Sequence, residues 1–142
     1  MFFYLQLVNM SKKTTKNEIN ERAKRLQAAI AKLSQIKAEI EAQGEIAPQG
    51  CYVARYQARG QKYRYWYYQL KAPEAIFLKT NSENEYSRYQ HLGSSGSEAH
   101  INGVLAVVRR VQIDELTKAI DGLKESWLDL YSDDKKVGNR VE

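Results

Sequence analysis

The sequence predicts an α+β protein in which two long antiparallel helices form a coiled-coil-like pair, with a small antiparallel β-meander inserted between them. Apolar residues recur at helical spacing over residues 16–43 and again over residues 95–131. Between these stretches, residues 50–92 are rich in aromatic, β-branched and turn-forming residues, a composition typical of strands. A chain of 142 residues has the length of one domain, so we expect residues 1–142 to form a single domain.

The first helix is predicted over residues 16–43. Thr15 and Glu18 have the spacing of a capping box, in which each side chain bonds the other residue's amide. Gly44 is placed to end the helix, which would be roughly 40 Å long at 1.5 Å per residue. Its apolar stripe repeats every seven residues at Ile19, Leu26, Leu33 and Ile40. A single stripe on so long a helix calls for a partner helix.

The meander begins with a hairpin in residues 50–71, which hold six of the ten tyrosines and a cluster of basic residues. Gly60 supplies the turn, as Arg59-Gly60 or Gly60-Gln61, between strands near 51–58 and 62–71. Two further strands are predicted at residues 75–80 and 85–92. The simplest arrangement of the four is an antiparallel meander.

Side chains alternate across a strand, so the hairpin has two faces. The tyrosine face carries Tyr52, Ala54, Tyr56, Ala58, Tyr63, Tyr65, Tyr67 and Gln69. The cationic face carries Cys51, Val53, Arg55, Gln57, Lys62, Arg64, Trp66, Tyr68 and Leu70. The tyrosine face suits packing beneath a helix, whereas the cationic face is apolar at its base and basic at its tip. Arg55 is expected opposite or diagonal to Arg64, and their repulsion requires open solvent or an anionic partner.

The second helix is predicted from a capping box at Ser95 and Glu98 to about Tyr131. Its first half is apolar at Ile101, Val104, Leu105, Val108 and Val111, and its second half at Ile113, Leu116, Ile120, Leu123, Trp127 and Leu130. The two stripes are offset by roughly 80°. Either the helix kinks near 111–113, or its halves bury against different elements. We expect the first half to cover the tyrosine face, the second half to pair with the first helix, and residues 133–142 to fray.

Charge favours an antiparallel pairing of the helices. Residues 12–25 hold six basic and two acidic residues, whereas residues 121–134 hold one basic and five acidic residues. Such complementarity selects partner and orientation, and it could equally build a homodimer, with residues 33–40 adding to its seam. The excess positive charge then lies in residues 50–92, which hold seven basic and three acidic residues.

The basic tip predicts a nucleic-acid-binding accessory or regulatory protein with DNA as partner. A two-stranded ribbon can place arginines and lysines on phosphates and glutamine on base edges. The predicted contacts are Arg55, Gln57, Arg59, Lys62 and Arg64, with Lys79 and Arg88 as flanking phosphate partners and Tyr63 and Tyr65 stacking on bases of a single strand. The alternative for the tip is a solvated surface on which arginine stems cover aromatic rings.

The alternative function is a protein–protein interaction adaptor. Its helices and the aromatic base of the hairpin would dock on a larger partner, through Trp66, Tyr68 and Leu70, while the arginines meet acidic groups of that partner.

Catalytic chemistry has little support in the sequence. Two histidines, His91 and His100, are too few for a zinc site. We expect His91 at the edge of the sheet and His100 in the first turn of a helix. Residues 93–96 precede a helix but lack the lysine of a phosphate-binding loop. Arg109 and Arg110 lie mid-helix, where we expect a solvated face, with contacts to phosphate or acidic residues as the alternative. We therefore expect no enzyme activity, no metal and no cofactor.

The remaining composition indicates a cytoplasmic protein. Cys51 is the one cysteine, which rules out an intrachain disulfide, and the net charge of +5 permits an anionic partner. Residues 1–10 are apolar but too short to span a bilayer, and we expect no membrane association. They suit a packed strand or an extension upstream of a start at Met10.

One stretch resembles a known family. Gly50 to about Lys79 carries G-x-x-V-x-R-Y, then a glycine turn and a tyrosine-rich strand. This pattern resembles the three-stranded DNA-binding arm domains of tyrosine recombinases, and the resemblance implies DNA binding by the sheet. It covers roughly a fifth of the chain, and the flanking helices do not match that family, so no residue role is carried over.

Overall fold

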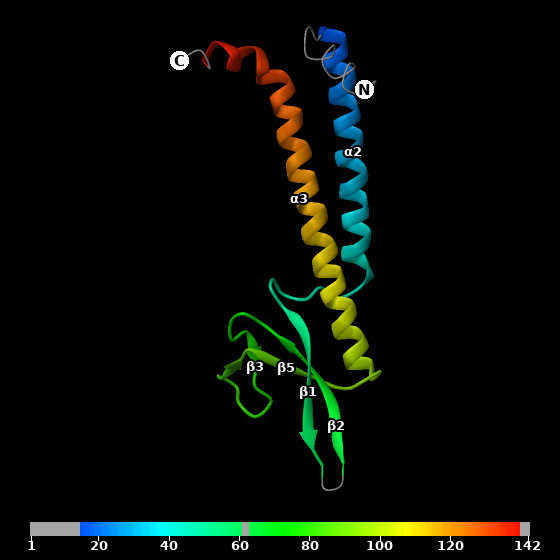
Figure 1. Cartoon of the computed structure of the whole chain (residues 1–142), viewed down its shortest axis with the longest axis vertical. Coiled ribbons are helices and arrows are strands. Elements are labelled where there is room, and N and C mark those ends of the chain that lie inside the picture. The colour runs from blue at the N-terminus through cyan, green and yellow to red at the C-terminus, as the bar shows by residue number, and fades with distance from the viewer. Residues whose placement is uncertain (1–14, 61–62, 140–142) are drawn as a thin grey trace, which may run out of the picture. The chain divides into compact units, whose positions relative to one another are not determined.

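The computed structural model describes residues 15–60 and 63–139 (Figure 1). The chain divides into two compact units. One unit comprises residues 1–36 and 116–142, and the other comprises residues 37–115. The architecture is α+β as predicted, with a small antiparallel sheet between two helices in the chain.

Helix α2 (Lys16–Gln43) has the predicted bounds. The capping box is confirmed, because the Glu18 amide donates to Thr15 Oγ1 and the Thr15 amide donates to Glu18 Oε2, each at 3.2 Å. Helix α3 (Glu98–Asn139) continues past the predicted end near Tyr131. In the unit that contains residues 16–36 and 116–139, Ala23 and Ile120 are buried. The coiled-coil pairing and its charge complementarity stay predictions.

The sheet has three antiparallel strands in the order β1-β2-β5. Its strands are β1 (Tyr52–Arg59), β2 (Arg64–Lys71) and β5 (Tyr89–Ser94), and a separate ribbon pairs β3 (Phe77–Leu78) with β4 (Tyr86–Ser87). This arrangement differs from a continuous four-stranded meander. The predicted fourth strand is divided at Arg88: its first part pairs with β3, and its second part takes the place beside β2.

The register of the hairpin confirms the two predicted faces. Ala54 lies opposite Gln69 and Tyr56 opposite Tyr67, as alternation requires. The turn is longer than predicted, because the last cross-strand pair is Arg59 with Arg64 and the Gly60 amide donates to the Tyr63 carbonyl at 2.9 Å. The prediction that Arg55 lies opposite or diagonal to Arg64 is therefore wrong.

Helix α3 packs on the base of the cationic face, so the prediction that it covers the tyrosine face is wrong. Tyr68 stacks on His100, with ring centroids 4.0 Å apart. The buried core cluster consists of Ala47, Cys51, Leu70, Ala72, Leu92 and Ala106. Small helix residues explain this choice of face: a Cβ at Gly103 would lie 2.7 Å from Leu92 Cδ1, so glycine permits the close approach.

The apolar stripe predicted to pack on the sheet is instead exposed. Ile101, Leu105, Val108 and Val111 of α3 are between 42% and 56% exposed. They lie on the side of the helix opposite to Gly103 and Ala106, because the two sets differ by about half a helical turn. The stripe therefore remains available as a surface.

The start of α3 is fixed two residues beyond the predicted cap. Ser97 Oγ accepts from the His100 amide at 3.2 Å and donates to the Leu92 carbonyl at 3.0 Å, so the cap is Ser97 and the predicted box at Ser95 and Glu98 is not formed. Just before it, a bulge in the pairing of β2 with β5 places Gly93 at φ 84°, a conformation that favours glycine.

Two arginines fasten the segment between α2 and β1 to helix α3. Arg110 Nε donates to the Ala47 carbonyl at 2.7 Å, and Arg109 donates from its guanidinium to the Glu45 carbonyl at 3.0 Å. The Ala47 amide donates to the Ala106 carbonyl at 3.0 Å. The expectation of a solvated face is therefore wrong for both arginines, and the alternative of a contact with an acidic residue is confirmed for Arg110, whose guanidinium lies 3.3 Å from Asp114 Oδ1.

In the described part of the chain, no helix is both long and apolar enough to cross a membrane. The predictions made for residues 1–10 lie outside the described residues.

Candidate nucleic-acid interface

The outer half of the hairpin is a two-stranded ribbon. Strand β5 pairs with β2 only over residues 67–71, so residues 57–59 and 64–66 pair only with each other among the described strands. Figure 1 shows the far ends of β1 and β2 extending past β5. Neither outer edge of this ribbon is therefore paired with another described strand.

The basic side chains of the ribbon have no acidic partner among the described residues. Arg59 and Arg64 lie directly opposite each other, and both are exposed. Two ion pairs of the described residues, Lys79 with Glu85 and Arg110 with Asp114, involve neither arginine. Two adjacent guanidinium groups repel each other unless solvent or an anion lies between them.

Arg55 is held over an aromatic ring. Its guanidinium carbon lies 3.8 Å from the centre of the Trp66 ring, which is 44% exposed. The predicted covering of aromatic rings by arginine therefore occurs at this residue, as a cation–π contact. Gln57 lies opposite Trp66 and is exposed, so its amide can reach a bound ligand. Lys62 lies outside the described residues.

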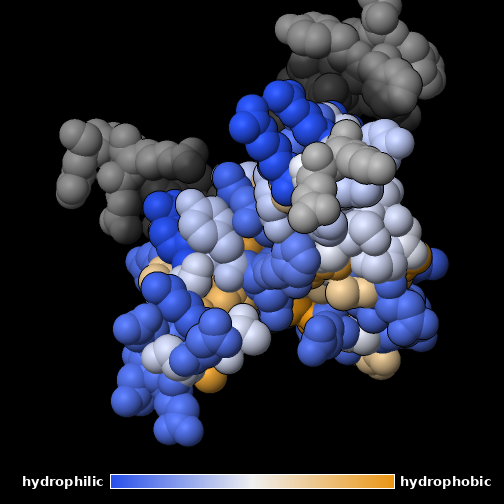
Figure 2. Space-filling model, turned by 90° about the horizontal axis from the view of Figure 1, so that it is seen from below, coloured by the Kyte–Doolittle hydropathy of each residue, from blue (hydrophilic) through white to orange (hydrophobic). Residues whose placement is uncertain are grey.

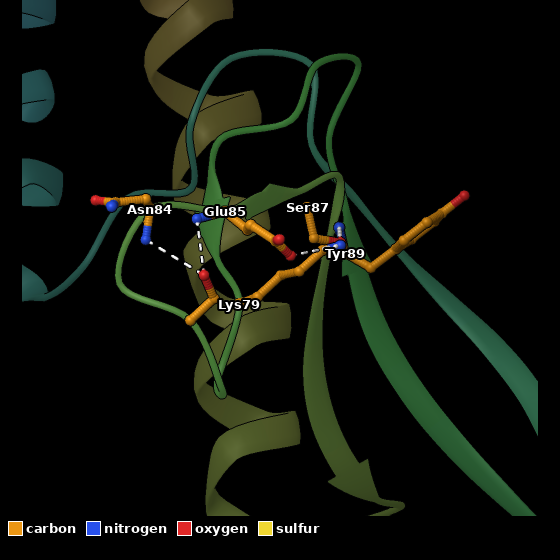
Figure 3. A network of polar contacts seen from close by, with 6 residues as sticks. Lys79, Asn84, Glu85, Ser87 and Tyr89 are labelled. Atoms are coloured by element: carbon orange, nitrogen blue, oxygen red, sulfur yellow. Dashed lines mark hydrogen bonds and ion pairs between the residues drawn. The ribbon is translucent and has the colours of Figure 1, made fainter.

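The predicted flanking cations have internal partners. Lys79 Nζ lies 3.5 Å from Glu85 Oε2, and Arg88 Nε donates to the Ala72 carbonyl at 3.2 Å. In Figure 3 the Lys79 and Glu85 side chains point toward one another, and the Tyr89 ring points away from them. The ion pair is more than half exposed on both sides, so it contributes little to stability.

The tyrosine face is the open face of the sheet. Tyr63 and Tyr65 are 68% and 48% exposed, and the Tyr65 ring lies 6.4 Å from the Tyr67 ring. Tyr56 and Tyr67 extend this row to His91, whose Nδ1 lies 2.8 Å from the Tyr56 hydroxyl. Sequence reasoning missed His91 as a member of this row. Its position beside β2 depends on the pairing of β5, which no local pattern specifies.

An open groove of about 1010 Å³ borders the tyrosine face. The strands supply Tyr56, Gln69, Gln90 and His91, and the β3–β4 ribbon supplies the opposite side. The groove combines aromatic rings with amide side chains, which donate and accept hydrogen bonds.

The predicted docking surface for an adaptor is largely buried. Leu70 is 4% exposed and belongs to the core, and Tyr68 packs on His100. Trp66 alone of the three predicted residues stays exposed. That prediction is wrong for Tyr68 and Leu70, because helix α3 packs on this face.

The described residues contain no group of three or more potential metal ligands. Burial raises the pKa of the Cys51 thiol above its ordinary value, and the nearby positive charge of Arg110 partly opposes this. A thiol in this state is a poor nucleophile, which fits its place in the core.

Seen from below, the molecular surface is largely hydrophilic, with smaller hydrophobic areas among the polar side chains (Figure 2).

Comparison of the chain with protein-family models, curated proteins and solved structures finds no match. The resemblance to recombinase arm domains gains no support from these comparisons.

Proposed function

We propose that the protein is a nucleic-acid-binding accessory or regulatory factor that contacts DNA through the outer ribbon of its hairpin. The observation that carries the proposal is the cross-strand pair of Arg59 and Arg64, both exposed and without an acidic partner among the described residues. Phosphate groups are the ligand that relieves this repulsion with bidentate bonds.

The shape of the ribbon agrees with this proposal. The major groove of DNA admits a two-stranded ribbon, and here residues 57–59 and 64–66 extend beyond the rest of the sheet. Gln57 stands on the same face as both arginines and can read a base edge. Arg55 is less free, because it lies over Trp66.

The test is fluorescence anisotropy with labelled duplex DNA over a salt series. Each phosphate contact contributes about 0.9 to the slope of log affinity against log salt concentration. The double variant Arg59→Ala, Arg64→Ala should reduce the slope by about 2 and weaken binding at low salt. The control Lys24→Ala, Lys32→Ala removes the same charge from exposed positions of α2. Equal slopes for the wild type and the hairpin variant, or equal losses in both variants, contradict the proposal.

The adaptor function is the second candidate, and the exposed stripe of α3 favours it. Ile101, Leu105 and Val108 present an apolar surface of the kind that helices bury on a partner protein. Leu105→Glu should then abolish capture of that partner and leave nucleic-acid affinity unchanged. Light scattering after gel filtration tests whether the same stripe forms a homodimer instead.

A cytoplasmic location and the absence of enzymatic activity remain part of the proposal. The reduced Cys51 thiol suits a reducing compartment.

A further inference from the structure

The tyrosine face carries a row of aromatic rings that the proposed duplex contact does not use. Centroids are 6.4 Å apart for Tyr65 and Tyr67 and 5.8 Å apart for Tyr67 and His91, while Tyr56 lies 6.0 Å from Tyr67. Neighbouring planes are inclined by 31° to 60°, so the rings are tilted rather than stacked on one another. Ring surface therefore remains available, for example at Tyr65, which is 48% exposed.

The row of rings leads into the groove at its His91 end. Tyr56 and His91 belong both to the row and to the wall of the groove, and Gln69 and Gln90 add amide groups beside them. The groove volume of about 1010 Å³ lies at the upper end of the range that small-molecule sites occupy, which is roughly 300–1,000 Å³. A nucleotide fits this space, and amide groups can pair with the edge of its base.

We infer that the tyrosine face binds single-stranded nucleic acid, whose unpaired bases stack on the row from Tyr65 to His91, with one base in the groove beside Gln69. This inference rests on the proposed function and names its substrate class. A duplex gains nothing from such a row, because its bases are already stacked, whereas unpaired bases expose both ring faces. Lys71 stands on the same face, 5.4 Å from the Tyr89 ring, and supplies a positive charge for the strand's phosphates.

The first experiment uses the unaltered protein. Labelled oligothymidine and oligouridine of about ten nucleotides are compared with an abasic strand of equal length and charge. The abasic strand should bind at least about tenfold more weakly, because losing a single stacked base already lowers affinity by roughly 5- to 150-fold. Comparison of the thymidine and uridine strands assigns DNA or RNA as the preferred source of unpaired bases. Equal affinity for the abasic and base-bearing strands overturns the inference.

The second experiment locates the stacking surface. Tyr65→Ala should lower affinity for the single strand at least about fivefold, and lower it more than affinity for the duplex, whereas Tyr65→Phe retains the ring and binds like the wild type. Tyr86→Ala is the matched control, since Tyr86 is 56% exposed but makes none of the ring contacts that form the row and does not line the groove. An equal loss for single strand and duplex in Tyr65→Ala contradicts the inference.

The two proposals fail in distinguishable ways. If duplex binding depends on Arg59 and Arg64 but single-strand affinity does not depend on the bases, only the inference about single strands is contradicted. If the protein binds neither duplex nor single-stranded nucleic acid, both proposals are contradicted. A protein partner captured through Leu105 then identifies the adaptor function.

Discussion

The ring of Tyr68 stacks on the ring of His100 at a centroid distance of 4.0 Å and an interplanar angle of 30°. Tyr68 stands in the middle of β2 and His100 in the first turn of α3. The Gly96 amide donates to His100 Nδ1 at 3.1 Å, so the same imidazole holds the turn that precedes the helix. One aromatic contact thus joins sheet, turn and helix.

This contact predicts an energetic coupling between the two residues. Tyr68→Ala should lower the free energy of unfolding by about 2–3 kcal/mol, and His100→Ala by about 1 kcal/mol. In a double-mutant cycle measured by urea denaturation, the pair should show a coupling energy of about 0.5–1.5 kcal/mol. Strict additivity of the two changes contradicts a direct contact.

Gly103 should tolerate no side chain. A Cβ there meets Leu92, which is buried in the core, so Gly103→Ala should destabilise the protein by about 1 kcal/mol despite the higher helix propensity of alanine. Gly122 on the same helix has nothing within 4 Å of an added Cβ. Gly122→Ala should therefore stabilise by about 0.5–1 kcal/mol. Thermal unfolding of both variants checks the prediction, which requires opposite signs.

Arg110 and Arg109 form a matched pair for testing the attachment of the segment before β1. Arg110→Ala should cost about 2 kcal/mol of unfolding free energy, since it leaves the carbonyl of the buried Ala47 without this charged donor. Arg109→Ala should cost less than about 1 kcal/mol, because Glu45 is exposed and water can replace the bond. Hydrogen exchange at the Ala47 amide should rise in the first variant only.

Stability should fall at alkaline pH through Cys51. Its pKa is raised in the folded state, chiefly by burial, so above about pH 9.0 the unfolded thiol ionises while the folded thiol stays protonated. The resulting loss begins near the ordinary thiol pKa and continues until the pH passes the folded value. Cys51→Ala lacks this loss and corrects for other titrating groups. Parallel stability curves for both proteins between pH 8 and 11 contradict the prediction.

Local patterns predicted the elements that local contacts determine. The bounds of α2 follow from the Thr15–Glu18 box and from Gly44, and both faces of the hairpin follow from strand alternation. The same alternation assigned the site residues Arg64 and Tyr65 to their faces, whereas Arg59, which was expected in the turn, is the last residue of β1 and lies opposite Arg64. Their exposure follows from the shortness of β5, which reaches β2 only over residues 67–71.

Long-range choices could not be predicted. The apolar stripe with Ile101 and Leu105 indicated the wrong buried side of α3, because close packing against Leu92 favours the side with Gly103 and Ala106. Binary patterns measure hydrophobicity and ignore side-chain size, which decides how near a helix can lie to a sheet.

The outer ribbon supplies no residue to the buried cluster, and on β1 and β2 the outermost residues packed against that cluster are Val53 and Tyr68. Substitutions in residues 57–59 and 64–66 thus escape the constraint that a packed interior imposes. Natural selection can therefore change what the outer ribbon binds while the rest of the protein keeps its sequence. Protein engineering could likewise replace the ribbon as a unit.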